Sequence, residues 1–463
     1  MFRDLKQRDR IPSGIEWAPQ IPADWKLVRN KSFMVSRKEI VGEASASQRL
    51  LALTKAGVVP RDIDNLEGKI PATFDGYQFV AEGDLVFCLF DIDETPRTLG
   101  LVPKPGMITS AYTRFEVSDE IDREFLAYFY TSVDDQKGLR PLYTGLRKSI
   151  RTDVLLSVRT PLPPADEQAA IVKYLAHAHA RIDRAIAAKR RLVALLEEQK
   201  QAIIYQAVTC GLDPSVPLKG SGIPWLGDVP AHWEASRAKY VFREFDARSG
   251  TGAERLLSLR AATGLVFHDE VSNRPIDQEA LVNYKKVHPG VFVMNRMRAA
   301  SGLFAIADSA GLVSPDYSTM MVSESVDSRY YLRLFKTRAA MAEFRNHSSG
   351  LGTGESGFMR LYSEDFGRIW LPVPPREEQE AIADHIASTE QASTAIVKRA
   401  RREMELLREF RTRLTSDVVT GQVDVREIAA TLPALSDDDP ALELDDELEG
   451  LLERELEPES VDE

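Results

Sequence analysis

A phrase that occurs twice, half a chain apart, constrains the fold of this sequence more than any other feature. SGIEWAPQIPADW occupies residues 13–25, and SGIPWLGDVPAHW occupies residues 221–233, an offset of 208 residues. Matched phrases that keep their order indicate an internal duplication, so the chain is two copies of one two-part unit. Two further pairs support this at an offset of 211 residues: PPADEQAAI (163–171) with PPREEQEAI (374–382), and AVTCGLD (207–213) with VVTGQVD (418–424).

The second part of each copy is predicted to be a long helix. From about Asp166 to Thr209, and from about Glu377 to Val419, apolar residues recur at steps of three and four, and neither segment contains Gly or Pro. About 40 residues at about 1.5 Å each form a helix near 60 Å long. A narrow apolar stripe of that length requires a partner helix, and the other copy is the simplest partner. We therefore expect the two helices to form a coiled coil.

The first part of each copy is predicted to be a mixed α/β globular domain, which we call a head. Short β-rich runs broken by Gly, Pro and Asp are followed by one helical stretch, 124–133 in the first copy and 329–345 in the second. The fold class is therefore α+β, with two mixed α/β heads joined by two long helices. The predicted boundaries are 1–163 for the first head, 164–213 for the first long helix, 214–374 for the second head, 375–425 for the second long helix and 426–463 for an acidic tail.

The net charge of −12 comes from the end of the chain. Residues 434–463 contain 14 Asp and Glu and one basic residue, Arg454, so the remaining residues carry a net charge near +1. A balanced body can still present a basic face to phosphate groups, so the charge permits nucleic-acid binding without demonstrating it. We expect the tail to be solvated and disordered. The alternatives are that it docks on a partner or masks a basic surface.

Several classes of protein are disfavoured by the sequence. No run of about 18 apolar residues is present, and the first residues lack the apolar core of a secretory signal. Cys88 and Cys210 lie far apart and outside any CxxC pattern, which disfavours a disulfide framework and a zinc site. We expect a cytoplasmic protein that does not contact a membrane.

The sequence also lacks a catalytic constellation. The histidines form no HExxH motif, no GxGxxG follows a predicted strand, and no GxxxxGK[ST] phosphate loop occurs. Asp62, Glu67 and Lys69 match the D…ExK pattern of metal-dependent nucleases, but acid-x-Lys occurs at several other places in this chain. We therefore expect no catalytic residue and no metal ligand, with a metal-dependent nuclease as the alternative hypothesis.

Two polar regions of each head are candidates for contact with nucleic acid. One lies just before each long helix, in GLRKSIR (145–151) and its counterpart ending at Arg360. The other lies near residues 285–298 of the second head, where the first head has CLFDID (88–93) after the equivalent strand. Such loops can bring guanidinium groups and hydroxyls to phosphates or base edges. A surface Arg is more often solvated or paired with an acid, so these residues are candidates only. They are Arg147, Lys148, Ser149, Arg151, Lys285, Lys286, Asn295, Arg296, Arg298 and Arg360.

The three repeated motifs together resemble those of the specificity subunits of type I restriction–modification systems. The likeness covers about residues 11–425 and rests on the W-L-G-x-[IV]-P-x-x-W phrase, the PPxxEQxxI helix starts and the VTxx[LV]D helix ends. The first copy departs from the first motif, with Ala-Pro after Trp17 in place of Leu-Gly. In that family each head is a target-recognition domain that reads half of a split DNA site. The long helices pair antiparallel as a spacer.

The resemblance implies a non-catalytic subunit of a phage-defence complex. Its partners would be double-stranded DNA, two methyltransferase subunits held by the long helices, and restriction/translocase subunits that join through the methyltransferase. No cofactor belongs to this chain on that view: S-adenosylmethionine would be used by the methyltransferase, and ATP and Mg²⁺ by the restriction subunit. Two different heads should read two different sequences, giving an asymmetric bipartite site. The remaining alternative is a purely structural coiled-coil adaptor.

Overall fold

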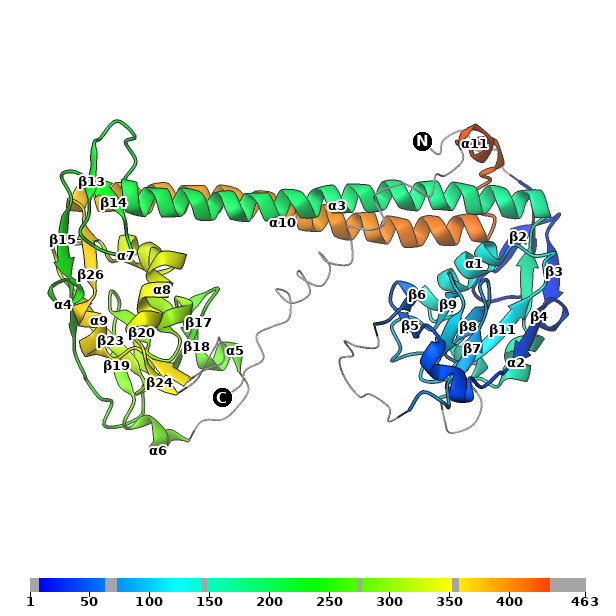
Figure 1. Cartoon of the computed structure of the whole chain (residues 1–463), viewed down its shortest axis with the longest axis horizontal. Coiled ribbons are helices and arrows are strands. Elements are labelled where there is room, and N and C mark those ends of the chain that lie inside the picture. Colours follow the sequence, from blue (N-terminus) through cyan, green and yellow to red (C-terminus); the bar gives the residue numbers. More distant parts are fainter. Residues whose placement is uncertain (1–7, 63–72, 144–147, 273–276, 352–357, 434–463) are drawn as a thin grey trace. The chain divides into compact units, whose positions relative to one another are not determined.

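A computed structural model (Figure 1) describes most of the chain, namely residues 8–62, 73–143, 148–272, 277–351 and 358–433. The chain divides into two compact units. The first unit combines two separate segments of the sequence, and the second unit is the segment between them. One unit is formed by residues 1–190 with 401–463, and the other by residues 191–400. Each unit therefore contains one head, the beginning of the long helix that follows this head, and the end of the other long helix.

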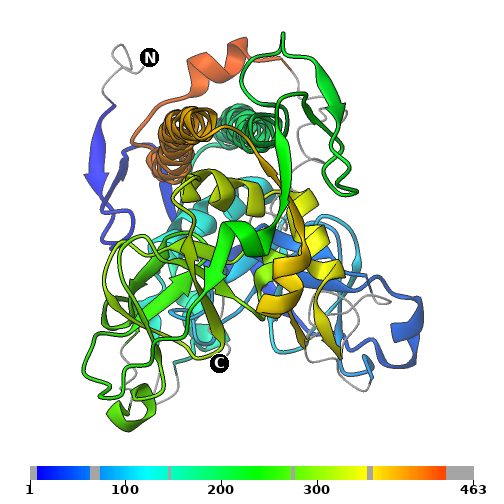
Figure 2. The same ribbon diagram turned by 90° about the vertical axis from the view of Figure 1, so that its left-hand side faces the viewer.

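The two long helices are α3 (Ala165–Cys210, 46 residues) and α10 (Arg376–Val419, 44 residues). Their bounds lie within one residue of those expected from the sequence. The helices lie side by side when viewed end-on (Figure 2), and apolar side chains join them within each unit. In the first unit Ile182 and Ile186 pack with Met404 and Leu407; in the second, Val193 and Leu196 pack with Val397 and Ala400.

Polar contacts in the first unit establish the direction of helix pairing. Residues with higher numbers in α3 contact residues with lower numbers in α10. The two helices are therefore antiparallel, as the family resemblance implied. The contacts join His179 to Thr415 (Nε2–Oγ1 2.9 Å), Asp183 to Arg411 (Oδ1–Nη1 2.9 Å) and Lys189 to Glu403.

Each head is built on a four-stranded antiparallel sheet with the same strand order. The order is β4 (Met34–Arg37), β11 (Thr113–Val117), β8 (Leu85–Phe87) and β9 (Leu99–Leu101) in the first head. In the second head it is β16 (Phe242–Glu244), β23 (Tyr317–Val322), β20 (Phe292–Asn295) and β21 (Phe304–Ile306). The predicted duplication of one fold is thereby confirmed.

Two-stranded antiparallel pairs surround each sheet. In the first unit they are β1 (Arg10–Pro12) with β2 (Gln20–Pro22), β3 (Lys26–Arg29) with β12 (Arg159–Leu162), β5 (Leu51–Thr54) with β6 (Gly57–Pro60), and β7 (Gln78–Val80) with β10 (Gly106–Ile108). In the second they are β13 (Leu218–Gly220) with β14 (Asp228–Pro230), β15 (Glu234–Arg237) with β26 (Trp370–Val373), β17 (Leu257–Arg260) with β18 (Gly264–Phe267), β19 (Lys285–Val287) with β22 (Gly311–Val313), and β24 (Ser349–Leu351) with β25 (Phe358–Arg360).

The helical layer differs between the heads. In the first head a single helix, α1 (Arg123–Asp135), begins at Asp122, whose side chain accepts hydrogen bonds from two backbone N–H groups of the first turn. The second head has two helices, α7 (Ser328–Phe335) and α8 (Arg338–Asn346), where the sequence predicted one stretch. The break occurs because the Thr337 side chain accepts a hydrogen bond from Ala340 N and caps a new helix.

Shorter helices complete the two units. They are α2 (Thr152–Ser157) in the first head, and α4 (Ala238–Val241), α5 (His268–Val271), α6 (Gln278–Leu281) and α9 (Ser363–Arg368) in the second. Helix α11 (Arg426–Thr431) follows α10 and falls inside the segment expected to be an acidic tail, with Ala429 buried. The acidic residues themselves, 434–463, lie outside the described part of the chain, so the expectation of disorder stays a prediction.

The three repeated motifs meet where the second head joins the long helices. Trp233 is buried, and its Nε1 donates to Glu378 Oε2 at 3.0 Å, which links the tryptophan phrase to the PPxxEQ motif. Gln379 Nε2 donates to Pro374 O at 2.7 Å, and its Oε1 accepts from the backbone N–H of Asp327. The tryptophan phrase therefore packs the second head onto the long helices.

The first unit repeats this junction with a partly different set of partners. Gln168 Nε2 donates to Pro163 O at 2.9 Å, and its Oε1 accepts from Asp122 N at 2.9 Å, as Gln379 does in the second unit. Glu167 instead accepts a hydrogen bond from Arg8 Nη2 at 2.9 Å. The glutamine of the motif thus anchors the same helix start in both units, while the neighbouring glutamate binds different partners.

Within the described residues, no helix is both long enough and apolar enough to cross a membrane.

Candidate nucleic-acid interface

In the first head, the two candidate regions of the sequence come together at the end of β8. The backbone N–H of Ile150 donates to Leu89 O at 2.7 Å, and that of Asp91 donates to Lys148 O at 2.8 Å. Phe90 also forms an isolated β-bridge with Ser149. Residues 88–98, which we call the first loop, therefore lie against the segment that precedes α2.

The second head brings the corresponding regions together in the same way. The backbone N–H of Leu361 donates to Arg296 O at 2.9 Å, so the segment that follows β20 lies against the end of β25. We call residues 295–303 the second loop. Asn295 Oδ1 accepts from the backbone N–H groups of Met297 and Arg298 at 3.0 and 3.3 Å, which shapes the turn. Asn295, Arg298 and Arg360 thus belong to one surface.

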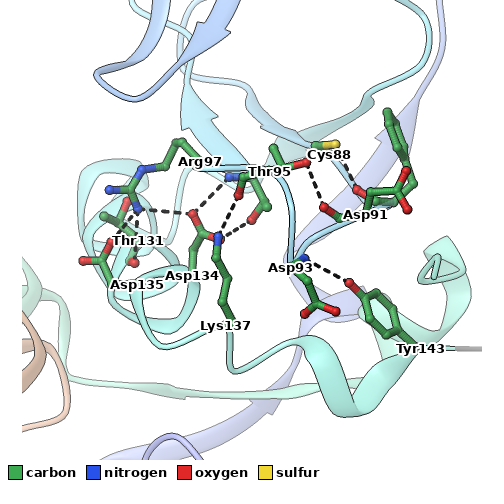
Figure 3. Close-up of polar contacts among 12 residues, drawn as sticks. Cys88, Asp91, Asp93, Thr95, Arg97, Thr131, Asp134, Asp135, Lys137 and Tyr143 are labelled. Atoms are coloured by element: carbon green, nitrogen blue, oxygen red, sulfur yellow. Dashed lines mark hydrogen bonds and ion pairs between the residues drawn. The ribbon is translucent and has the colours of Figure 1, made fainter. Parts of the chain in front are cut away.

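The first loop is held in place by a buried carboxylate (Figure 3). The Asp134 side chain is fully buried and accepts hydrogen bonds from Thr98 N at 3.0 Å and Thr98 Oγ1 at 2.6 Å. Its charge is balanced by Arg97 Nη1 at 3.2 Å and Lys137 Nζ at 3.0 Å. A buried carboxylate with its donors in place resists movement, because losing these donors would leave an uncompensated buried charge.

Further contacts bend the first loop back on itself. Lys137 Nζ donates to Thr95 O at 2.8 Å, while Thr95 N and Oγ1 both donate to Asp91 O at 2.9 Å. The backbone N–H of Asp93 donates to the Tyr143 hydroxyl at 3.2 Å (Figure 3). The tip of the loop, Phe90 and Asp91, is therefore positioned by backbone contacts, which leave both side chains exposed.

The candidate residues of the segment before α2 are exposed and engaged with acids. Lys148 Nζ lies 3.0 Å from Glu94 Oε1, and this contact raises the pKa of Lys148. Arg151 Nη2 lies 2.7 Å from Asp153 Oδ2. Ser149 takes part in the bridge with Phe90. Arg147 lies outside the described residues.

The expectation from the sequence that Lys285 contacts DNA is wrong, because this side chain is buried. Its side chain is 4% exposed and its Nζ lies 3.7 Å from Glu244 Oε1; burial lowers its pKa. An ammonium group in this position cannot reach a phosphate. Lys286 points the other way, its side chain is 45% exposed, and its Nζ lies 2.7 Å from Glu254 Oε1. Hydrogen bonds from Lys286 and Ser249 lower the pKa of Glu254 to about 2.

The two arginines of the second loop have different surroundings. Arg296 Nε donates to Asp316 O at 2.6 Å and its Nη2 donates to Pro315 O at 2.7 Å, so its guanidinium ties the loop to the turn before β23. Arg298 is exposed, and its side chain has no hydrogen bond or ion pair within the described residues. Arg360 Nη1 lies 3.4 Å from Asp316 Oδ1. Arg298 is thus the more available of the two loop arginines.

The nuclease hypothesis rests largely on residues beyond the described ranges. Asp62 is described, but Glu67 and Lys69 are not. Across the part of the chain that the structure covers, no three His, Cys, Asp or Glu side chains are grouped so as to hold a metal ion.

Sequence reasoning missed Phe90 and Asp91 as candidate residues. The available signal was the repeat itself, because these residues align with Met297 and Arg298 at an offset of 207.

The chain has two heads of one fold that carry different loops, and its long helices pair antiparallel. Proteins with this organisation are found among the known type I specificity subunits. The chain is 22% identical over 428 residues to the type I restriction enzyme MjaVIII specificity subunit of Methanocaldococcus jannaschii, which covers 88% of this chain and 95% of that protein. It is 23% identical over 296 residues to the putative MjaX specificity subunit of the same organism, covering 60% and 63%.

Solved structures show the same likeness. The HsdS subunit from Thermoanaerobacter tengcongensis superposes with a TM-score of 0.51 at 17% identity, covering 87% of this chain and 98% of that one. A chain from a structure on complex assembly and conformational transition of the type I R-M system gives a TM-score of 0.60 at 16% identity, covering 87% and 99%. No family model matches the chain. The resemblance to type I specificity subunits is thus confirmed, and the chain has their fold.

Proposed function

We propose that this chain is the sequence-specific DNA-recognition subunit of a type I restriction–modification complex and is itself non-catalytic. The observation that carries the proposal is that two heads of one fold bring different side chains to the same exposed place, after β8 and after β20. A shared frame with divergent loops suits the reading of two different half-sites, because base readout depends on the side chains that reach the groove. The DNA site would therefore be bipartite and asymmetric.

The proposed DNA contacts are those candidates that the heads leave accessible. They are Lys148, Ser149 and Arg151 in the first head, and Lys286, Asn295, Arg298 and Arg360 in the second. Arg147 stays a candidate from the sequence alone. Arg296 is proposed to position the second loop, because its donors are already bound to backbone carbonyls. Lys285 is left out because it is buried.

The long helices are proposed to act as a spacer and as the seat of two methyltransferase subunits, with restriction/translocase subunits joining through these. Helices of 46 and 44 residues would bound the half-site separation at roughly 20 base pairs, at about 1.5 Å per residue and about 3.4 Å per base pair. S-adenosylmethionine would be bound by the methyltransferase, and ATP and Mg²⁺ by the restriction subunit.

The test is a map of modified bases in DNA from cells that express this chain with its methyltransferase. The proposal expects methylation at one split, asymmetric sequence, absent when this chain is omitted. Lengthening both helices by one turn should change the spacer and leave the half-sites unchanged. Methylation with no dependence on this chain would contradict the recognition role and favour the structural adaptor.

The nuclease alternative has a separate test. The purified chain with Mg²⁺ should leave plasmid DNA intact. Cutting that disappears in Lys69→Ala would overturn the non-catalytic assignment.

A further inference from the structure

The tips of the first and second loops occupy equivalent positions in the two heads. Leu85 and Phe292 begin equivalent strands, and each strand pairs with the same two neighbours. Leu89 O accepts from Ile150 N, as Arg296 O accepts from Leu361 N. Counting forward from these contacts, Phe90 corresponds to Met297 and Asp91 corresponds to Arg298.

The first residue of each pair is apolar and exposed to the same extent. Phe90 and Met297 are each 38% exposed. The Phe90 ring stacks on Tyr112 with a centroid separation of 6.4 Å, and Met297 Sδ lies 3.9 Å from Arg360 Nη2. Both heads therefore place an apolar side chain beside the charged one, where it can lie against a base edge and exclude water.

The second residue of each pair is charged, with opposite signs in the two heads. Asp91 and Arg298 are both exposed, and within the described residues neither side chain has a hydrogen bond or ion pair. The neighbouring acids of the first loop are engaged: Asp93 Oδ1 lies 3.5 Å from Arg140 Nε, and Glu94 Oε1 lies 3.0 Å from Lys148 Nζ. The free charge at each tip is thus confined to one residue.

Asp91 is held where it is at a conformational cost. Its φ is +45°, a left-handed conformation that a residue with a Cβ adopts only at a cost. The Lys148 carbonyl and the Thr95 donors impose this conformation through the backbone of Asp91. The phosphates of DNA would repel a free carboxylate at this place. Asp91 must therefore contribute to DNA binding by accepting a hydrogen bond from a donor group on a base.

We propose that Asp91 and Arg298 are equivalent specificity-determining residues that read opposite partners in the two half-sites. The Asp91 carboxylate accepts a hydrogen bond from an exocyclic amino group in the major groove, on cytosine N4 or adenine N6. The Arg298 guanidinium donates to O6 and N7 of a guanine. This inference rests on the proposed DNA-recognition function and adds the class of base contact that each head makes.

The experiment measures methylation by the full complex with its methyltransferase on plasmid libraries in which one half-site at a time is randomised. Asp91→Gly removes the carboxylate and suits the positive φ, so folding is preserved. Discrimination at one base pair of the first half-site should then fall by roughly tenfold to a hundredfold, because a good base contact contributes about 1–3 kcal/mol. Asp91→Asn should favour adenine at that base pair, because asparagine recognises adenine through N6 and N7. A wild-type preference for cytosine should therefore shift to adenine, and a wild-type preference for adenine should be kept.

The matched change in the second head is Arg298→Gln, which should shift one position of the second half-site from guanine towards adenine. Glu82→Gln and Arg243→Gln remove an exposed charge of the same sign elsewhere on each head and serve as controls. The base that the wild-type complex prefers at the affected position of the first half-site also shows whether Asp91 contacts cytosine or adenine.

The outcomes separate the two proposals. A change confined to one base pair of the mutated head's half-site supports the inference. Unchanged discrimination in Asp91→Gly and Arg298→Gln, with the wild-type complex still methylating a split site, overturns it and leaves the proposed function standing. A uniform change at all sequences, equal to that of the controls, also overturns it. If the wild-type chain directs no split methylation at all, the proposed function fails.

Discussion

The two heads have sheets of the same strand order and the same junction glutamine, yet their loops are supported by different chemistry. The first loop depends on a buried carboxylate, Asp134, that binds the side chains of Arg97 and Lys137. The second loop is held by Asn295 and by a guanidinium, Arg296, that binds backbone carbonyls. Both heads have the same sheet, but different residues hold the loop that follows β8 and the loop that follows β20. The loops can therefore differ without disturbing the sheet.

The contact of each head with its own long helix shows the same contrast. In the first unit the Tyr128 ring packs edge-on against His179 of α3, with ring centroids 5.4 Å apart. At the equivalent place in the second unit, Arg333 of α7 forms an ion pair with Glu390 of α10. One head is joined to its helix by a neutral aromatic contact and the other by charges, so the two units should respond differently to pH.

The largest effect that tests this comparison is expected at Asp134. Asp134→Ala should lower the free energy of unfolding of the first head by about 3–5 kcal/mol, because it leaves buried cationic and hydroxyl donors without their acceptor. Asp316→Ala, which removes a half-exposed carboxylate near Arg296 and Arg360, should cost about 1 kcal/mol or less. Hydrogen exchange measured separately for the two heads checks both values. Equal losses would show that the two loops are supported alike.

A smaller difference is expected at the glycines that end the long helices. Gly421 and Gly211 both have positive φ, +70° and +77°. A Cβ on Gly421 would lie 2.5 Å from Pro22 Cδ, whereas one on Gly211 would lie 2.9 Å from Oε1 at the end of the Glu378 side chain. We expect Gly421→Ala to cost about 2–4 kcal/mol and Gly211→Ala about 1–2 kcal/mol, because a proline ring cannot move aside. Chemical denaturation of the full chain measures both; Gly227→Ala, with positive φ and open space, is the control.

The effect that is smallest near neutral pH is a dependence of the first unit on pH, which grows as the pH falls. Burial, aided by Arg411, lowers the pKa of His179 to about 3 from an ordinary value of 6.5. The folded state therefore favours the neutral ring: its stability is complete above pH 6.5 and falls as the pH drops towards 3. At pH 5 the loss should be about 2 kcal/mol. His179→Gln should remove this acid sensitivity, as measured by unfolding of the first unit between pH 7 and 5. A variant that keeps the full slope would assign the sensitivity to other groups.

Much of the fold could be predicted from the sequence, because the duplication and the apolar periodicity each extend over many residues. Both long helices were obtained in this way, whereas their antiparallel pairing was implied by the family resemblance. The break between α7 and α8 was missed because one capping threonine, Thr337, overrides an otherwise continuous helical pattern.

The residues of the candidate interface were harder to predict, because their exposure depends on tertiary contacts. Lys285 and Lys286 are adjacent in a strand, so one of them must face inward. The buried Val287, next in the alternation, indicated that Lys285 is the inward one. Phe90 and Asp91 were overlooked because neither is one of the basic residues expected of a DNA contact, and only the alignment of their loop with the second loop identifies them.

The division of the chain into units also bears on the order in which the protein assembles during synthesis. The second unit is continuous, residues 191–400, whereas the first needs residues 401–433 to complete its helix pair and the junction at Trp25 and Glu167. Since domains complete their folding as their residues emerge from the ribosome, the head made first must wait for the last segment. The second unit should therefore mature before the first. During that interval the apolar stripe on the start of α3 has no partner helix, so a nascent chain arrested near residue 400 should be the species most in need of a chaperone.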